Sequence, residues 1–252
     1  MRVKHRRRVM RIIGCWLVAI ACHQNELMAP GPPANLVVQS GDAQQAVVAT
    51  ALAEQIVVKV TDARDGAVPG VTVTFRPGPA SGDATPPQAI TDVNGFARTA
   101  WTMGTTAGLG KSLEARVADG EGSFALVVLH ATALPGPATA LRMMTEPASA
   151  EESGVPIVRA PVVQLVDTYE NGVPQAHVVV GVAAVGDTPH ALGGTTTVAT
   201  DANGIASFCL TIFGPPDFVT LIFTAQSLSS AASSPIDLLP TSDIVTPRIP
   251  CA

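Results

Sequence analysis

Apolar and polar residues alternate with a period of two through the first half of the chain. The pattern is clearest over residues 56–61 and 71–75, where every second residue is Ile, Val or Phe. This period is typical of a β-strand with one side on a core. Further strand-like runs cover residues 36–39, 96–103, 113–117 and 123–131. The pattern predicts about seven strands in this half and no amphipathic helix.

Turn residues separate these runs. Gly66, Pro69 and Gly70 lie between the first two strands, and Asn94-Gly95 precedes a later one. Gly and Asn adopt positive φ readily, and Pro presets a turn. Short strands with turns at short intervals predict an antiparallel β-sandwich of two sheets.

The pattern occurs twice. Residues 57–75 and 91–97 match residues 162–180 and 200–206, with offsets of 105 and 109 residues. A period near one hundred residues fits a small domain present in tandem. We therefore expect module one at residues 34–133, a Pro-rich linker at 134–137 and module two at 138–239.

The two copies agree in which residues point inward. Ala206, Phe208, Leu210 and Ile212 fall where Ala97, Thr99, Trp101 and Met103 fall in module one. The same offset puts His177 at the outward position of Thr72, and Val180 where module one has Phe75. Because the inward and outward positions agree in both copies, the repeat supports the prediction of a β-sandwich.

The motifs Val-Thr-Asp, Val-Pro-Gly-Val-Thr-Val-Thr-Phe and Thr-Asp-x-Asn-Gly-x-Ala (within residues 60–75 and 91–97) resemble bacterial immunoglobulin-like domains of the invasin/intimin type. Module two matches less closely, with Gln175 after Pro174. The resemblance implies an all-β protein of two tandem Ig-like antiparallel β-sandwich domains without a central disulfide. It also implies a stalk or adhesive role at a cell surface.

The N-terminus is predicted to be a targeting segment. Residues 1–11 carry six Lys and Arg, and residues 12–21 form an apolar run of ten, the size of a signal-peptide core. Ala21 precedes Cys22 as at a lipoprotein processing site. We expect a signal peptide at 1–21, lipidation at Cys22 and a tether at 22–33. The alternative is an ordinary secretory signal.

Removal of the signal leaves a strongly acidic chain. Six of the 15 Lys and Arg precede Cys22 and all 20 Asp and Glu follow it, which leaves a net charge of −11. A nucleic-acid partner is not expected, because the basic footprint is missing. An anionic membrane would repel the chain, so membrane attachment is expected through the lipid anchor.

Catalysis needs a convergent set of nucleophile, base and donors. The histidines after the signal are scattered and have no metal-ligand spacing: His23, His130, His177 and His190. No nucleophile-elbow, phosphate-loop or zinc-protease motif is present. The sequence therefore predicts a protein that is not an enzyme, with no catalytic residue and no cofactor.

Two acidic turns are candidate calcium sites. Asp62 with Asp65, and Asp92 with Asn94, carry oxygen ligands of the kind that Ca²⁺ takes. Asp and Asn also initiate turns by bonding their own backbone. The spacing lacks a calcium-loop signature, so the prediction is a turn role and no metal.

Two aromatic residues after the targeting segment bear on sugar binding. Trp101 falls on the inward phase, which favours packing in the core. Tyr169 falls in a turn, where a single exposed ring offers little for stacking a sugar.

Two cysteines remain after Cys15 is removed and Cys22 is lipidated. We predict a disulfide between Cys209, on the outward phase of its strand, and Cys251, in the C-terminal tail 240–252. Disulfides persist in exported proteins. Two free thiols or an intermolecular bridge are the alternatives.

These inferences predict a lipid-anchored protein of the bacterial envelope, periplasmic or surface-exposed, with a structural or adhesive role. Its partner is expected to be a protein or another cell-surface component. The alternative is a carbohydrate-binding or enzyme-associated accessory module.

Overall fold

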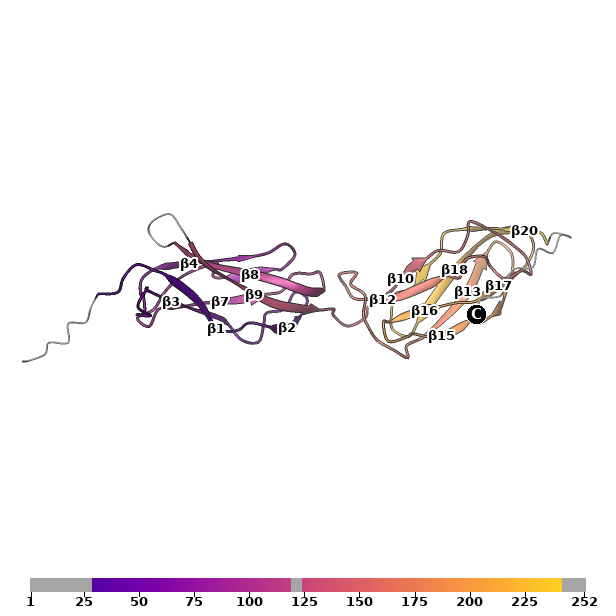
Figure 1. The fold of residues 1–252 in the computed structure, drawn as a ribbon. Coiled ribbons are helices and arrows are strands. Elements are labelled where there is room, and N and C mark those ends of the chain that lie inside the picture. The colour runs from indigo at the N-terminus through magenta and orange to yellow at the C-terminus, as the bar shows by residue number, and fades with distance from the viewer. Residues whose placement is uncertain (1–28, 119–123, 242–252) are drawn as a thin grey trace, which may run out of the picture.

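The computed structural model describes residues 29–118 and 124–241, and within these ranges every regular element is a β-strand. The all-β prediction is confirmed. Figure 1 shows two groups of strands placed end to end and joined by one connection.

The strands of module one are β1 (Asn35–Ser40), β2 (Gln44–Val47), β3 (Ile56–Thr61), β4 (Thr72–Pro77), β5 (Asp83–Thr85), β6 (Gln88–Ile90), β7 (Phe96–Thr102), β8 (Gly108–Ala118) and β9 (Phe124–Leu134). They form two sheets, β1-β3-β7-β5 and β2-β9-β8-β4-β6. Neighbours are antiparallel except β2, which runs parallel to β9. The chain therefore changes sheets between β1 and β2.

The strands of module two are β10 (Ala140–Thr145), β11 (Ala150–Glu152), β12 (Val162–Val166), β13 (Val179–Gly186), β14 (Ala191–Gly194), β15 (Thr197–Ala199), β16 (Ile205–Ser207), β17 (Leu210–Phe213), β18 (Asp217–Ala225), β19 (Ala231–Ala232) and β20 (Ile236–Leu239). The sheets are β10-β12-β16, β11-β20-β18-β13-β15 with β19 beside β18, and the pair β14-β17. The chain again changes sheets after its first strand. Strand β10 pairs with β12, whereas β11 joins the other sheet, where it runs parallel to β20.

Each module has its own hydrophobic core. The buried apolar residues form two clusters, one between Leu36 and Ala133 and one between Leu141 and Leu238. The inward phase predicted for 97–103 and 206–212 is confirmed, because all eight inward residues are at most 2% exposed. Trp101 lies in the first core, where its Nε1 donates to the Ser81 carbonyl at 2.7 Å.

The predicted place of His177 is wrong. The backbone N–H of His177 donates to the Thr200 carbonyl, as that of Gly70 does to Thr91. His177 therefore takes the place of Gly70, and not that of Thr72. It has the same left-handed backbone, with φ 65° against 75°. The connection before it is two residues longer in module two.

This insertion also moves the counterpart of Phe75. Val180 matches Val73, and Val182 matches Phe75. Phe75 lies opposite Ala115 in the sheet, whereas Val182 lies opposite Phe223. The large and small residues are exchanged between partner strands, so each core stays filled.

Candidate functional site at the module junction

Asp62 holds the segment that leads into module one. Its Oδ1 accepts the backbone N–H groups of Arg64 at 2.9 Å and Gly66 at 2.8 Å. Its Oδ2 accepts the N–H of Gly31, 31 residues earlier, at 2.9 Å. One carboxylate thus closes its own turn and fixes the incoming chain.

Asp167 repeats this arrangement in module two. Its Oδ1 accepts the N–H groups of Tyr169 at 2.8 Å and Asn171 at 3.0 Å. Its Oδ2 accepts the N–H of Gly136 at 2.8 Å. Since Gly136 belongs to the linker, this carboxylate fixes the connection between the modules.

Both carboxylates are held in the ionised form. Hydrogen bonds from the backbone N–H groups of Gly31, Arg64 and Gly66 lower the pKa of Asp62 below its ordinary value. Burial acts against this at Asp167, but the Asn171 side chain and three backbone N–H groups still lower its pKa. The negative charge is therefore part of both turns at neutral pH.

Asn171 carries the contact across the junction. Its Nδ2 donates to the Thr105 carbonyl at 2.8 Å, and its Oδ1 accepts the N–H of Ala107 at 2.8 Å. The same Nδ2 donates to Asp167, so Asn171 joins the loop of module two to the β7–β8 loop of module one. Module one has Gly66 at the corresponding position, without a side chain that could make such a bridge.

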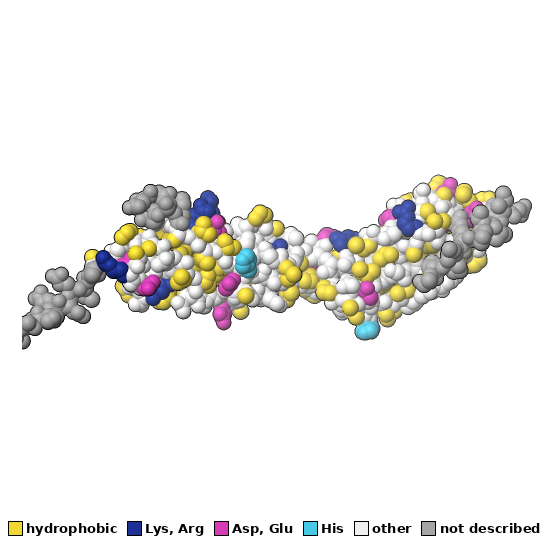
Figure 2. All heavy atoms as spheres, viewed as in Figure 1, with side chains coloured by type: hydrophobic (Ala, Val, Ile, Leu, Met, Phe, Trp, Pro, Cys, Tyr) yellow, Lys and Arg dark blue, Asp and Glu magenta, His cyan; other side chains and the backbone are white. Residues whose placement is uncertain are grey.

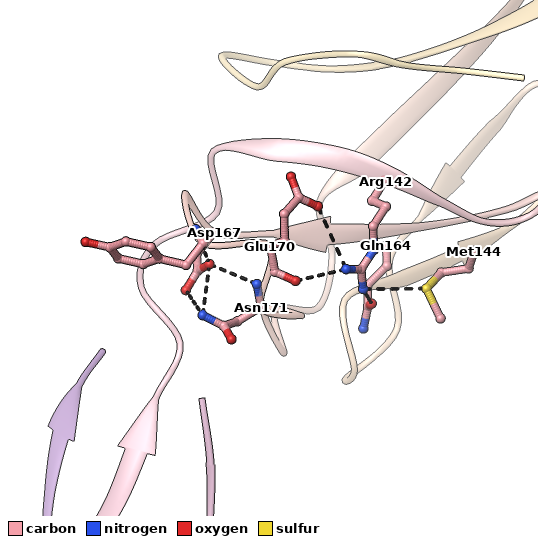
Figure 3. A network of polar contacts seen from close by, with 7 residues as sticks. Arg142, Met144, Gln164, Asp167, Glu170 and Asn171 are labelled. Carbon is pink, nitrogen blue, oxygen red and sulfur yellow. Dashed lines mark hydrogen bonds and ion pairs between the residues drawn. The ribbon is translucent and has the colours of Figure 1, made fainter. Parts of the chain in front are cut away.

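A second network secures this loop to its own module. Arg142 on β10 donates to the Glu170 carbonyl at 2.9 Å and to Gln164 Oε1 at 3.0 Å. It also contacts the sulfur of Met144 at 3.8 Å. Figure 3 shows this group continuing into the Asp167–Asn171 turn. The Arg142–Glu170 ion pair is exposed and contributes little by itself.

An apolar groove lies beside these contacts. It has a volume of about 400 Å³ and no charged residue among those that line it: Ala107, Gly108, Leu109, Thr132, Ala133, Leu134, Pro135, Asn171, Gly172 and Pro174. Leu109 is 85% exposed and stands on a bulge between two glycines of positive φ. Bulges of this kind re-aim a side chain.

The junction holds no arrangement suited to bond chemistry. Its polar groups are used to position backbone, and its groove is uncharged. Within residues 29–118 and 124–241, no group of three His, Cys, Asp or Glu is placed to hold a metal ion. What the geometry supplies is a fixed relation between two sandwiches.

The candidate calcium residues serve their own turns. Asp62 accepts N–H groups as described, and Asp65 donates its backbone N–H to the Asp62 carbonyl at 3.1 Å. Asp92 Oδ1 accepts the N–H groups of Asn94 at 2.9 Å and Phe96 at 3.0 Å.

The other predicted site residues are far apart or outside the described ranges. Cys22 and Cys251 lie outside the described residues, as does the predicted signal peptide. Cys209 lies half-buried between β16 and β17 and is disulfide-bonded. It is the one cysteine among the described residues, so its partner lies beyond them, and the pairing with Cys251 stays a prediction. Tyr169 is 44% exposed in its turn.

The roles of Arg142 and Asn171 were not predicted from the sequence. A signal for Asn171 was present, because it stands at the position of Gly66 in a turn that begins with the same Asp in both copies. A polar side chain replacing glycine in one copy alone is a pointer to a contact that this copy alone makes.

The chain was compared with known proteins. No protein-family model and no curated protein matches the sequence. Several solved structures are similar in fold. One is the adhesin InvE of Yersinia pseudotuberculosis, with 18% identity and a TM-score of 0.35 over 82% of this chain. The chain spans 60% of the InvE chain.

Two others represent different classes of protein. The D00-D0 domain of intimin has 13% identity and a TM-score of 0.42, with 81% of this chain and 99% of that chain covered. A β-glycosidase from Bacteroides vulgatus has 10% identity and a TM-score of 0.36, with 80% and 24% covered. Adhesins of the invasin/intimin type, which the motifs resemble, are thus among the neighbours. The likeness extends to fold alone.

Within the described part of the chain, no helix is long and apolar enough to cross a membrane. Figure 2 shows charged side chains scattered over the visible face, with apolar ones between them on both sides of the junction.

Proposed function

We propose that the chain is a non-enzymatic protein of the bacterial envelope, with a structural or adhesive role toward a protein partner. The observation that carries the proposal is the junction. Two sandwiches with separate cores are joined end to end through the bridge from Asn171 to Thr105 and Ala107. Such a rod can hold a binding surface at a distance from its anchor.

The anchor is proposed to be a lipid on Cys22, with the segment to Pro33 as tether. Asp62 already holds Gly31, so the free part of the tether is residues 23–30, which span at most about 30 Å when fully extended. The net charge of −11 after removal of the signal would keep the modules away from an anionic membrane surface. The acidic modules and the lipid then act together to project the rod.

Metabolic labelling with a fatty-acid analogue tests the anchor. The full chain should take up label, Cys22→Ser should lose it, and Cys209→Ser should keep it as the matched control. Label that persists in Cys22→Ser would contradict the anchor.

Cross-linking in living cells tests the partner. The full chain should recover an envelope or surface protein, and an excess of purified chain should compete this recovery away. The purified chain is also applied to a glycan array. Binding to a defined glycan that free sugar competes away would instead favour the carbohydrate-binding alternative.

A further inference from the structure

One face of module two carries no charge. It is the outward face of the large sheet, where β13 lies between β18 and β15 (Figure 1). The outward positions are the odd-numbered residues 179–185 on β13, the even-numbered residues 218–224 on β18, and Thr197 and Ala199 on β15. All of these positions are described, and none holds a charged side chain. We call this surface the β13–β18 face.

The β13–β18 face is largely apolar and open to solvent. Phe218 is 65% exposed, Val179 59% and Val185 55%, although each lies on a regular strand whose alternate residues point into the core. Ala183 on β13 and Ile222 on β18 are cross-strand partners near the middle of the face. Apolar groups therefore extend across two neighbouring strands, which is the kind of surface that marks an interaction site.

The same face of module one is charged. Arg76 on β4 and Glu114 on β8 are cross-strand partners there, one residue beyond the Phe75–Ala115 pair. Ala183 and Ile222 hold these two positions in module two, one residue beyond the Val182–Phe223 pair. Arg116, which forms an ion pair with Glu114, likewise has an uncharged counterpart. The two modules therefore differ in the charge of a face that they otherwise share.

This difference runs against the overall charge of the modules. Residues 138–239 contain nine Asp and Glu but two Lys and Arg, so module two is the more acidic of the two. Two copies of such a module repel each other unless they meet over a surface without charge. The β13–β18 face is such a surface.

The absence of charges of either sign also bears on the kind of partner. A partner that is recognised through charge needs complementary charges on this chain, and the β13–β18 face has none to offer. In a two-fold symmetric pair, residues near the axis meet their own copies. A charge of either sign would there face the same charge, so an uncharged face is suited to such a pair.

We propose that the β13–β18 face packs against the same face of a second copy of this chain, sheet on sheet. The eight residues of β13 extend about 26 Å and the five strands of the sheet about 24 Å, so each copy would bury about 600 Å². The pair would bury about 1,200 Å², at the lower end of the range for specific complexes. The expected product is a reversible dimer that dissociates on dilution through the micromolar range. This inference does not rest on the proposed function, because neither the lipid anchor nor another partner enters it.

Sedimentation velocity over a range of concentrations tests the pairing. The sample is residues 23–252, which include all described residues and lack the predicted targeting segment. Wild type should pass from monomer to dimer as the concentration rises. Ala183→Asp and Ala183→Lys should each raise the dissociation constant at least about tenfold, because like charges then meet near the axis. Circular dichroism checks that both variants fold, as expected for an exposed outward position.

A mixture of the two variants identifies the occupant. Equal amounts of Ala183→Asp and Ala183→Lys should form a dimer again, because opposite charges now meet across the axis. No occupant other than a second copy predicts this recovery. Thr72→Asp and Thr72→Lys are the matched controls, since Thr72 is an exposed outward residue on the corresponding sheet of module one. Neither control should change the dissociation constant.

Three results would overturn the proposal. The first is wild type that stays monomeric up to several hundred micromolar, which would leave the face to another protein or to the chain's own tail. The second is a dimer that Ala183→Asp does not weaken, or that non-reducing electrophoresis shows to be solely a covalent one through Cys209. The third is a mixture of the two Ala183 variants that stays monomeric although each variant is folded.

Discussion

Asp62 and Asp167 each accept three backbone N–H groups, and each joins its own turn to the segment that leads into its module. One carboxylate therefore satisfies three backbone donors from two segments, which would otherwise need separate acceptors. Its removal leaves the donors of both the turn and the incoming segment without an acceptor at once.

Replacement of Asp167 tests this role. Asp167→Ala should lower the free energy of unfolding of module two by about 1–3 kcal/mol, the usual cost of leaving buried donors without a partner. Asp187→Ala, at an exposed loop position, should change it by less than about 0.5 kcal/mol. Urea unfolding followed by circular dichroism measures both. Equal effects of the two substitutions would contradict the role of Asp167.

The lowered pKa of Asp167 sets the direction of a pH effect. A carboxylate whose folded pKa lies below its unfolded value of 3.8 stabilises the fold above pH 3.8. This contribution is lost as the pH falls through the folded pKa. The urea midpoint of module two should therefore fall between pH 5 and pH 3 by less in Asp167→Asn than in wild type. Parallel curves would show that Asp167 does not contribute to the pH dependence.

At the scale of elements, the turn 167–171 keeps the carboxylate-to-backbone hydrogen bonds of its copy 62–66 but carries Asn171 in place of Gly66. Modules joined by a short linker move relative to each other unless their interface holds them. The two hydrogen bonds of Asn171 are polar contacts that join the modules across that interface.

Asn171→Gly should therefore loosen the junction and leave both sandwiches folded. The expected result is faster, more independent tumbling of the modules, measured by ¹⁵N relaxation of the full chain. Gly66→Asn is the matched control, because it creates the same turn at the other end of module one. It should leave the tumbling unchanged. Identical relaxation in Asn171→Gly and wild type would assign the rigidity to the linker alone.

The exchange of large and small residues between strands gives another prediction. Val182→Phe should destabilise module two by about 1–3 kcal/mol, because Phe223 already fills the space opposite. Adding Phe223→Ala to Val182→Phe recreates the Phe75–Ala115 pair of module one and should recover part of that loss. Unfolding free energies of the single and double variants measure the coupling. Additive losses would contradict it.

The alternation of residues predicted the long strands and the inward phase of β7 and β16–β17, because both depend on the period of the chain itself. The short strands β5 and β6 were not predicted, since three residues carry too little pattern. The insertion before His177 was missed for a different reason. A left-handed residue is usually Gly, and sequence spacing alone does not show that His177 adopts that conformation in its place.

The junction could not be predicted from the sequence, because it is made by contacts between distant residues that no local pattern contains. Asn171 and Thr105 are 66 residues apart, and they meet because two modules pack end to end. Gly31 and Asp62 are 31 residues apart and meet where the incoming segment folds back on module one. Repeats in the sequence located both turns, but the partner of each carboxylate became visible in the folded chain.

At the scale of the whole molecule, the two cores share no residue, so each module should fold alone. The C-terminal boundary of module one follows from its backbone hydrogen bonds and not from the period of the sequence repeat. Strand β9 runs to Leu134, whose carbonyl accepts the N–H of Val48 at 2.9 Å. An isolated module one must therefore include Leu134, one residue beyond the predicted boundary.

Residues 29–135 should then fold on their own with one cooperative transition in urea. Trp101 reports on it, because its ring is fully buried and it is the one Trp in residues 29–135. The urea midpoint measured by its fluorescence should agree with the midpoint in the full chain. The difference should be no larger than the small stabilisation that the junction contributes. A chain ending at Val128 removes the part of β9 that pairs with β2, and it should show a lower midpoint or no transition. If residues 29–135 show no cooperative transition while the full chain does, module one depends on module two for its fold, and the rod is one folding unit.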